Sequence, residues 1–223
     1  MMRLNDDIRP LSHRLCDETR SALEEYTRSA CPQAAVSGSL SRDAYAEWLT
    51  ALRPLHAALD RQIIAHTEDV PLLSTTVPDD ALQCPWLDES LAAMGKSATP
   101  ARSPEAEAAV ELVNNAAEHE PIKLFAHHFV REGLINVGGY LAPRVRDAWG
   151  DAKPGELRFL DPYGRGQRPL WARFCRDVDK HRMTEHEKQA LATAAVEMLQ
   201  ALTAISNASG DLAEAPKLLP VSL

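Results

Sequence analysis

The most informative segment of the chain, residues 125–144, reads FAHHFVREGLINVGGYLAPR. It lies in a region of helical periodicity, yet it contains Gly133, Gly138 and Gly139. Each glycine inside a helix costs about 1 kcal/mol relative to alanine, so three of them need a reason. One reason is that bare backbone lets a helix approach a flat ligand closely. The other is tight packing against a neighbouring helix, and the spacing alone leaves both readings open.

The rest of the chain is also predicted to be helical. Apolar residues recur at helical spacing from Ser12 to Ala30 and again from Ser41, where Pro54 is expected to kink the helix. Further helices are predicted over 85–94, from Pro104 onward, and over 121–149, 168–181 and 184–206. A turn is predicted over 31–39 and a long loop over 150–167. No segment alternates with period two. We therefore predict an all-α bundle of seven or eight helices.

One domain accounts for the length of the chain. A chain of 223 residues can build a single sizeable core. We assign residues 1–10 to an N-terminal extension, 11–206 to the helical domain and 207–223 to a tail. The net charge of −8 argues against a nucleic-acid partner. No apolar run is long enough to cross a membrane, and four scattered cysteines suggest reduced thiols, so we expect a cytoplasmic protein.

Glu132-Gly133 followed by Gly138-Gly139 resembles the distal helix of the haem oxygenases, with one additional residue between the two elements. Further segments are similar to that family and occur in the same order along residues 11–205. They are Leu15–Glu24, Leu40–Leu59, Pro85–Gly95, Phe159–Gly164 and Trp171–Phe174. The resemblance implies the haem-oxygenase-like all-α fold in a single domain.

This resemblance also implies a function. Haem oxygenases hold haem between a proximal and a distal helix, and a proximal histidine ligates the iron. Haem is cleaved to biliverdin, carbon monoxide and ferrous iron, with electrons from a reductase or a ferredoxin. By this resemblance Gly133, Gly138 and Gly139 would bring the distal backbone close to the ligand.

Position 23 departs from the family pattern. The first helix of the family reads like Leu-x-x-x-Thr-x-x-x-His-Glu, whereas this chain has Leu15, Thr19, Leu23 and Glu24 in that register. Leucine has no lone pair and cannot coordinate iron. The resemblance therefore predicts haem or a related tetrapyrrole at a site whose proximal ligand position is vacant, which makes cleavage doubtful.

Several other residues are weaker candidates for the site. His13, His56, His66, His127 and His128 are each better explained as surface or core histidines. The pairs Cys31-Pro32 and Cys84-Pro85 resemble a dipeptide of haem-sensing proteins but are short.

Two arginines are candidates for holding haem propionates. Arg173 and Arg176 lie three residues apart in the region where the family presents basic residues. The forked guanidinium suits carboxylates. A solvated helix face explains the pair equally well.

Three alternatives stay open beside haem cleavage. A non-catalytic tetrapyrrole binder or regulatory homologue is favoured by Leu23. A di-iron oxygenase of the same fold is suggested by Glu120 with His127 and by Asp177 with His181, whose spacing places ligands on one helix face. A thiaminase-like member ranks last, because no catalytic cysteine with a supporting acid–base set is evident.

Overall fold

The computed structural model describes residues 9–78, 81–97 and 103–210, and this part of the chain is helical without strands. Its ten α-helices run in the order α1 (Leu11–Glu18), α2 (Arg20–Thr27), α3 (Ala30–Ser37), α4 (Arg42–His66), α5 (Pro71–Thr76), α6 (Cys84–Ala93), α7 (Pro104–His119), α8 (Lys123–Trp149), α9 (Gln167–Val178) and α10 (Glu185–Gly210). A short 3₁₀ turn, η3 (Gly164–Gly166), precedes α9. The predicted all-α class is confirmed. Most of the extension and tail assigned from the sequence, residues 1–8 and 211–223, lies outside the described residues.

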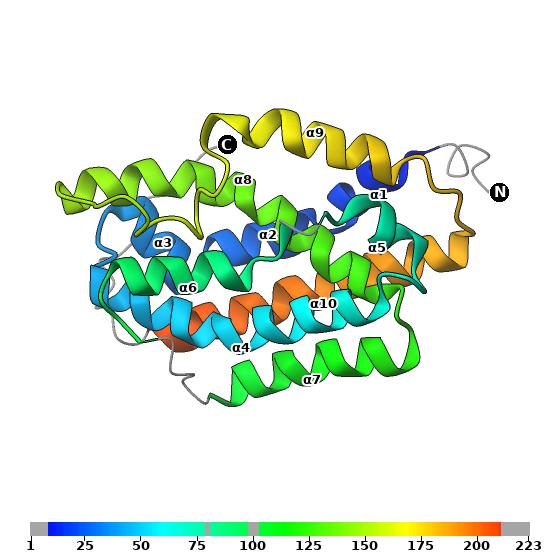
Figure 1. Cartoon of the computed structure of the whole chain (residues 1–223), viewed down its shortest axis with the longest axis horizontal. Helices are drawn as coiled ribbons and strands as arrows, with labels where there is room; N and C mark the ends of the chain where they lie inside the picture. Colours follow the sequence, from blue (N-terminus) through cyan, green and yellow to red (C-terminus); the bar gives the residue numbers. More distant parts are fainter. Residues whose placement is uncertain (1–8, 79–80, 98–102, 211–223) are drawn as a thin grey trace.

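Helix α4 supplies the central apolar stripe of the core. Its buried side chains recur every three to four residues, as a helix with one core-facing side requires. They include Tyr45, Trp48, Leu49, Leu52, Leu55, Leu59 and Ile63. Helices α7 and α10 pack on α4, and α10 also packs on α8. Figure 1 shows α7 on one side of this core and α9 on the opposite side.

Several helix boundaries follow from local chemistry that the sequence displays. The Ser103 hydroxyl accepts a hydrogen bond from the amide of Ala106 at 3.1 Å, which caps α7 ahead of Pro104. Thr184 and Glu187 form the predicted capping box before α10. Gly95 adopts the left-handed conformation after α6.

Other boundaries differ from the sequence prediction. The helix expected over 12–30 is divided at Thr19, whose hydroxyl donates to the carbonyl of Leu15 at 2.7 Å and so competes with the backbone ladder. The turn expected over 31–39 is mostly helix α3, because Pro32 lies in its first turn, where proline is tolerated. Helix α4, in contrast, agrees with the prediction in that Pro54 lies inside it without ending it.

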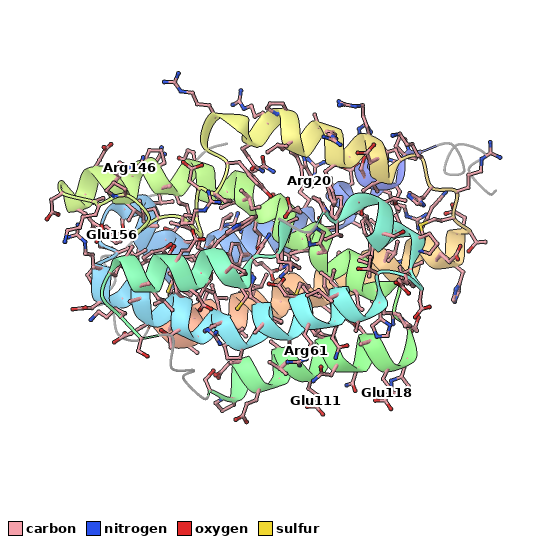
Figure 2. All side chains as sticks on the ribbon, viewed as in Figure 1. Arg20, Arg61, Glu111, Glu118, Arg146 and Glu156 are labelled. Carbon is pink, nitrogen blue, oxygen red and sulfur yellow. The ribbon has the colours of Figure 1, made fainter. Side chains whose placement is uncertain are left out.

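The segment after α8 returns along that helix and is anchored at both ends of its path. Arg42 of α4 pairs with Asp151 at 2.8 Å and with the buried carboxylate of Glu156 at 3.3 Å. Figure 2 shows Glu156 near the end of the bundle where α8 terminates. The amide of Phe159 donates to the hydroxyl of Ser90 at 3.0 Å. These contacts fix the loop to α4 and α6, and its Leu160 backbone lies against α8 at Gly138.

Candidate functional site

The three glycines of α8 face three different surroundings. A Cβ on Gly133 would lie 3.6 Å from the Trp171 ring of α9, which is ordinary contact. A Cβ on Gly138 would lie 2.1 Å from the carbonyl oxygen of Leu160. A Cβ on Gly139 would meet nothing within 4 Å among the described residues.

Gly138 therefore has a structural reason that does not involve a ligand. The loop backbone at Leu160 crosses α8 so closely that a side chain at position 138 would overlap it. This is packing of backbone against backbone, the second of the two readings that the sequence left open.

Gly139 has no such reason within the described structure. It is half-buried in the interior of a helix of 27 residues, and no neighbour excludes a methyl group. Glycine lowers the stability of a helix interior, and here no packing contact explains that cost. Open space above bare helical backbone fits the close approach of a flat ligand.

A small cavity lies between α4, α8 and α10. It measures about 30 Å³ and is bordered by Gly138 and by Tyr26 of α2, while Leu23, Gly133 and Gly139 do not line it. One or two water molecules would fill this volume, whereas pockets for drug-sized ligands measure about 300–1,000 Å³. A tetrapyrrole therefore requires the helices to move apart.

The polar end of this cavity is formed by His56, Gln83 and Arg131. The fully buried Arg131 guanidinium donates to Asp60 Oδ1 at 2.5 Å and to His128 Nδ1 at 3.1 Å. Asp60 also accepts the backbone amide of Cys84 at 2.8 Å. The resulting network ties α4, the start of α6 and α8 together.

Three buried histidines surround this network. Burial, followed by the charge of Arg131, lowers the pKa of His56 to about 3 and that of His127 to about 4, and it lowers the pKa of His128 well below its usual value. All three rings are therefore neutral at pH 7. Nitrogens without a hydrogen-bond partner among the described residues are His56 Nδ1, His128 Nε2 and both nitrogens of His127. Neutral imidazole is the form that binds metals.

Leu23 lies half-buried on α2 and packs against the core beside the buried residues Ala22 and Tyr26. Its side chain has no atom that could coordinate iron. The other two histidines named from the sequence are more accessible, since His13 is exposed and His66 is half-buried. No histidine lies on α2.

Helix α9 covers α8 through aromatic side chains. Trp171 lies 5.3 Å from Phe129 between ring centroids, and Phe174 lies 5.9 Å from both Phe129 and His128. Arg173 and Arg176 are exposed instead. The Arg173 side chain is 75% exposed and its Nε lies 3.7 Å from Asp177. The structure thus places the two arginines at the solvent face of α9 and does not bring them to the glycines.

The exposed side of α9 and its flanks is strongly basic, although the chain as a whole is acidic. Six cationic side chains are exposed between residues 165 and 182, namely Arg165, Arg168, Arg173, Arg176, Lys180 and Arg182. A cationic face on a protein of net charge −8 attracts acidic ligands and partners.

The candidate di-iron ligands are not gathered into a site. Glu120 pairs with Lys123 at 2.5 Å, and Asp177 pairs with Lys180 at 2.6 Å. His181 Nε2 lies 2.8 Å from the hydroxyl of Thr75. Among the described residues, no group of three or more His, Cys, Asp or Glu side chains could hold a metal ion.

The two Cys-Pro pairs begin helices. Cys31 is buried at the start of α3, and burial raises the pKa of its thiol to about 12. Cys84 is half-buried at the start of α6.

In the described part of the chain, no helix is long and apolar enough to span a membrane.

The sequence prediction missed the Asp60–Arg131 pair. Two charged residues, Arg131 and Glu132, follow His127 and His128 in a mostly apolar helix, and that departure was the available signal. Charged residues that are fully buried are nearly always paired. Their partners come from α4 and from Gln83 before α6, which the sequence cannot place beside α8.

Comparisons with known proteins agree with this fold. The family model described as heme oxygenase matches residues 9–207. The heme oxygenase structure from Leptospira interrogans is 18% identical, with a TM-score of 0.81 over 90% of this chain and 100% of that one. Heme oxygenase-2 from Synechocystis, solved in complex with heme and NO, is 18% identical, with a TM-score of 0.83 over 92% of this chain and 86% of that one. No curated protein matches the sequence.

Proposed function

The chain belongs to the haem oxygenase family, and we propose that it binds haem against the α8 backbone at Gly139. The observation that carries this proposal is the glycine itself. Gly139 costs the helix stability and no described neighbour requires it. A planar ligand lying on the backbone supplies the missing reason.

The residues around α8 suit a porphyrin in part. Phe129, Trp171 and Phe174 offer apolar and aromatic surface, which favours a flat hydrophobic ring. Arg173 and Arg176 point to solvent, so they could pair with propionates that extend to the surface. The protein would supply geometry and exclusion of water, while the bound haem supplies the redox chemistry.

Iron ligation differs from the family pattern in this proposal. Leu23 cannot donate an electron pair to iron, whereas His56, His127 and His128 are neutral rings with free nitrogens. We expect haem to bind without a histidine from α2. We therefore expect binding with slow or absent cleavage, and the non-catalytic reading is the one that Leu23 favours.

Haem that lies between α8 and its neighbouring helices requires those helices to separate, because the cavity beside the adjacent Gly138 measures about 30 Å³ and holds only water. The contact that would yield is between α9 and α8, since it rests on Trp171 and Phe174 and its outer face is solvated. The basic face of α9 also suits an acidic electron donor, such as a ferredoxin, if cleavage occurs.

Titration of the full chain with haemin, followed through the Soret band, tests this proposal. Saturable binding that weakens about tenfold in Gly139→Ala, with folding unchanged, supports it; tenfold corresponds to about 1.4 kcal/mol. A subsequent reductant system then separates conversion to a bile pigment from binding alone. Absence of a Soret shift would overturn the proposal, and two irons per chain found by metal analysis would favour the di-iron alternative.

A further inference from the structure

Helices α1 and α9 are far apart in the sequence but pack against each other in the fold. The backbone amide and the hydroxyl of Ser12 donate to the two carboxylate oxygens of Asp179, both at 2.9 Å. Figure 1 shows α1 beneath the C-terminal end of α9. The start of one helix is thus joined to the end of the other.

One turn further along this interface, each helix presents a cysteine. Cys16 follows Ser12 by four residues on α1, and Cys175 precedes Asp179 by four residues on α9. Residues four apart lie on the same helix face. The two helices pack on each other here, and Cys16 and Asp179 both contribute to the raised pKa of the Cys175 thiol. The two thiols therefore face the same patch from opposite helices.

We propose that Cys16 and Cys175 form a reversible disulfide that joins α1 to α9. Both thiols are free in this structure, and Cys16 is exposed, so a small oxidant in solvent reaches it first. The other two cysteines offer no comparable partner, because Cys31 lies on α3 and Cys84 on α6.

The oxidant in this reaction is a hydroperoxide, with hydrogen peroxide as the simplest case. The Cys16 thiolate attacks one peroxide oxygen, which forms a sulfenic acid and releases the other oxygen as water. The Cys175 thiolate then attacks the Cys16 sulfur, which forms the S–S bond and releases the hydroxyl group as a second water. Two thiols lose two electrons and two protons, and one peroxide becomes two waters.

The surroundings make this reaction slow at neutral pH. Partial shielding from water and the nearby Asp179 carboxylate raise the pKa of both thiols, and together with the Cys16 thiol they bring the pKa of Cys175 to about 12. Only the thiolate is the nucleophile. The pair is therefore expected to stay reduced until peroxide is abundant.

Mass spectrometry of the full chain tests the disulfide. After hydrogen peroxide treatment in mildly alkaline buffer and alkylation, we expect two of the four cysteines to resist alkylation and a peptide linking Cys16 to Cys175. Cys16→Ser and Cys175→Ala should each abolish the link, whereas Cys84→Ser should retain it. The melting temperature should rise by about 5–15 °C on oxidation, since a bridge across most of the chain restricts the unfolded state.

Three results would overturn the disulfide. They are full alkylation after oxidation, a Cys16 sulfinic acid without a cross-link, and a link to a cysteine other than Cys175.

The disulfide also has a consequence for haem uptake, which rests on the proposed function. A covalent tie between α1 and α9 restrains the opening beside α8, so the oxidised chain should take up haemin several-fold more slowly than the reduced chain. Cys16→Ser treated with the same oxidant should keep the faster rate, and equal rates in the two forms would overturn this consequence. If the reduced chain does not bind haemin, the proposed function fails while the disulfide result stands.

Discussion

Alanine substitution at the two adjacent glycines of α8 should have opposite effects on stability. At position 138 the new Cβ would lie 2.1 Å from the Leu160 carbonyl oxygen, whereas ordinary contacts begin at 3.4 Å. The loop backbone would have to retreat by more than 1 Å, and overpacking of this kind costs up to about 3 kcal/mol. The helical preference of alanine recovers about 1 kcal/mol. We expect Gly138→Ala to lose about 2 kcal/mol of unfolding free energy.

Position 139 is the matched control because the same substitution meets open space there. Gly139→Ala should gain up to about 1 kcal/mol from helix propensity alone. The two variants should therefore differ by about 3 kcal/mol, since 2 kcal/mol is lost at one position and 1 kcal/mol gained at the other. In a chain of this length, this corresponds to a difference of about 6–12 °C in melting temperature.

Urea unfolding followed by far-ultraviolet circular dichroism measures both free energies, and thermal melts check their order. The reasoning would be refuted if Gly138→Ala were as stable as the parent chain, because the Leu160 backbone would then not exclude a side chain. It would equally be refuted if Gly139→Ala were the less stable variant.

Three further outcomes follow from the buried groups. Leu23→His should bind haemin about tenfold more tightly and shift its Soret band if α2 faces the iron, and an unchanged spectrum would count against that placement. The three buried histidines have lowered pKa values, so the unfolded chain binds more protons; stability should fall below about pH 6.5, by up to about 1.4 kcal/mol per pH unit for each ring. His56→Phe should reduce the dependence of unfolding free energy on pH, and an unchanged pH profile would contradict the lowered pKa of His56. Asp60→Asn should cost about 3–5 kcal/mol in urea unfolding by leaving Arg131 buried without its carboxylate, and a loss below about 1 kcal/mol would mean that the pair is not needed.

Local patterns of residues account for much of the fold. The apolar repeat of α4 predicted its buried face, and Thr184 with Glu187 predicted the start of α10, because both depend on residues within a few positions of each other. The misreadings were local as well. The Thr19 hydroxyl can either cap or interrupt a helix, and Pro32 is compatible with a turn or with a first helical turn.

The candidate site was much less accessible to such reasoning. Gly138 and Gly139 are adjacent and chemically identical, yet a loop from 22 residues later lies on the first and open space lies on the second. Likewise, the spacing of Arg173 and Arg176 shows a shared side of α9, but it does not show that Trp171 and Phe174 take the side facing α8.

The order of residues along the chain was thus sufficient for the helical class, most helix boundaries and the family resemblance, since these depend on short-range periodicity and capping. The surroundings of each glycine and the burial of Arg131 beside Asp60 were decided by packing. Gly138 and Leu160 are 22 residues apart in the sequence and Asp60 and Arg131 are 71 residues apart, so only the folded chain brings their atoms within contact distance.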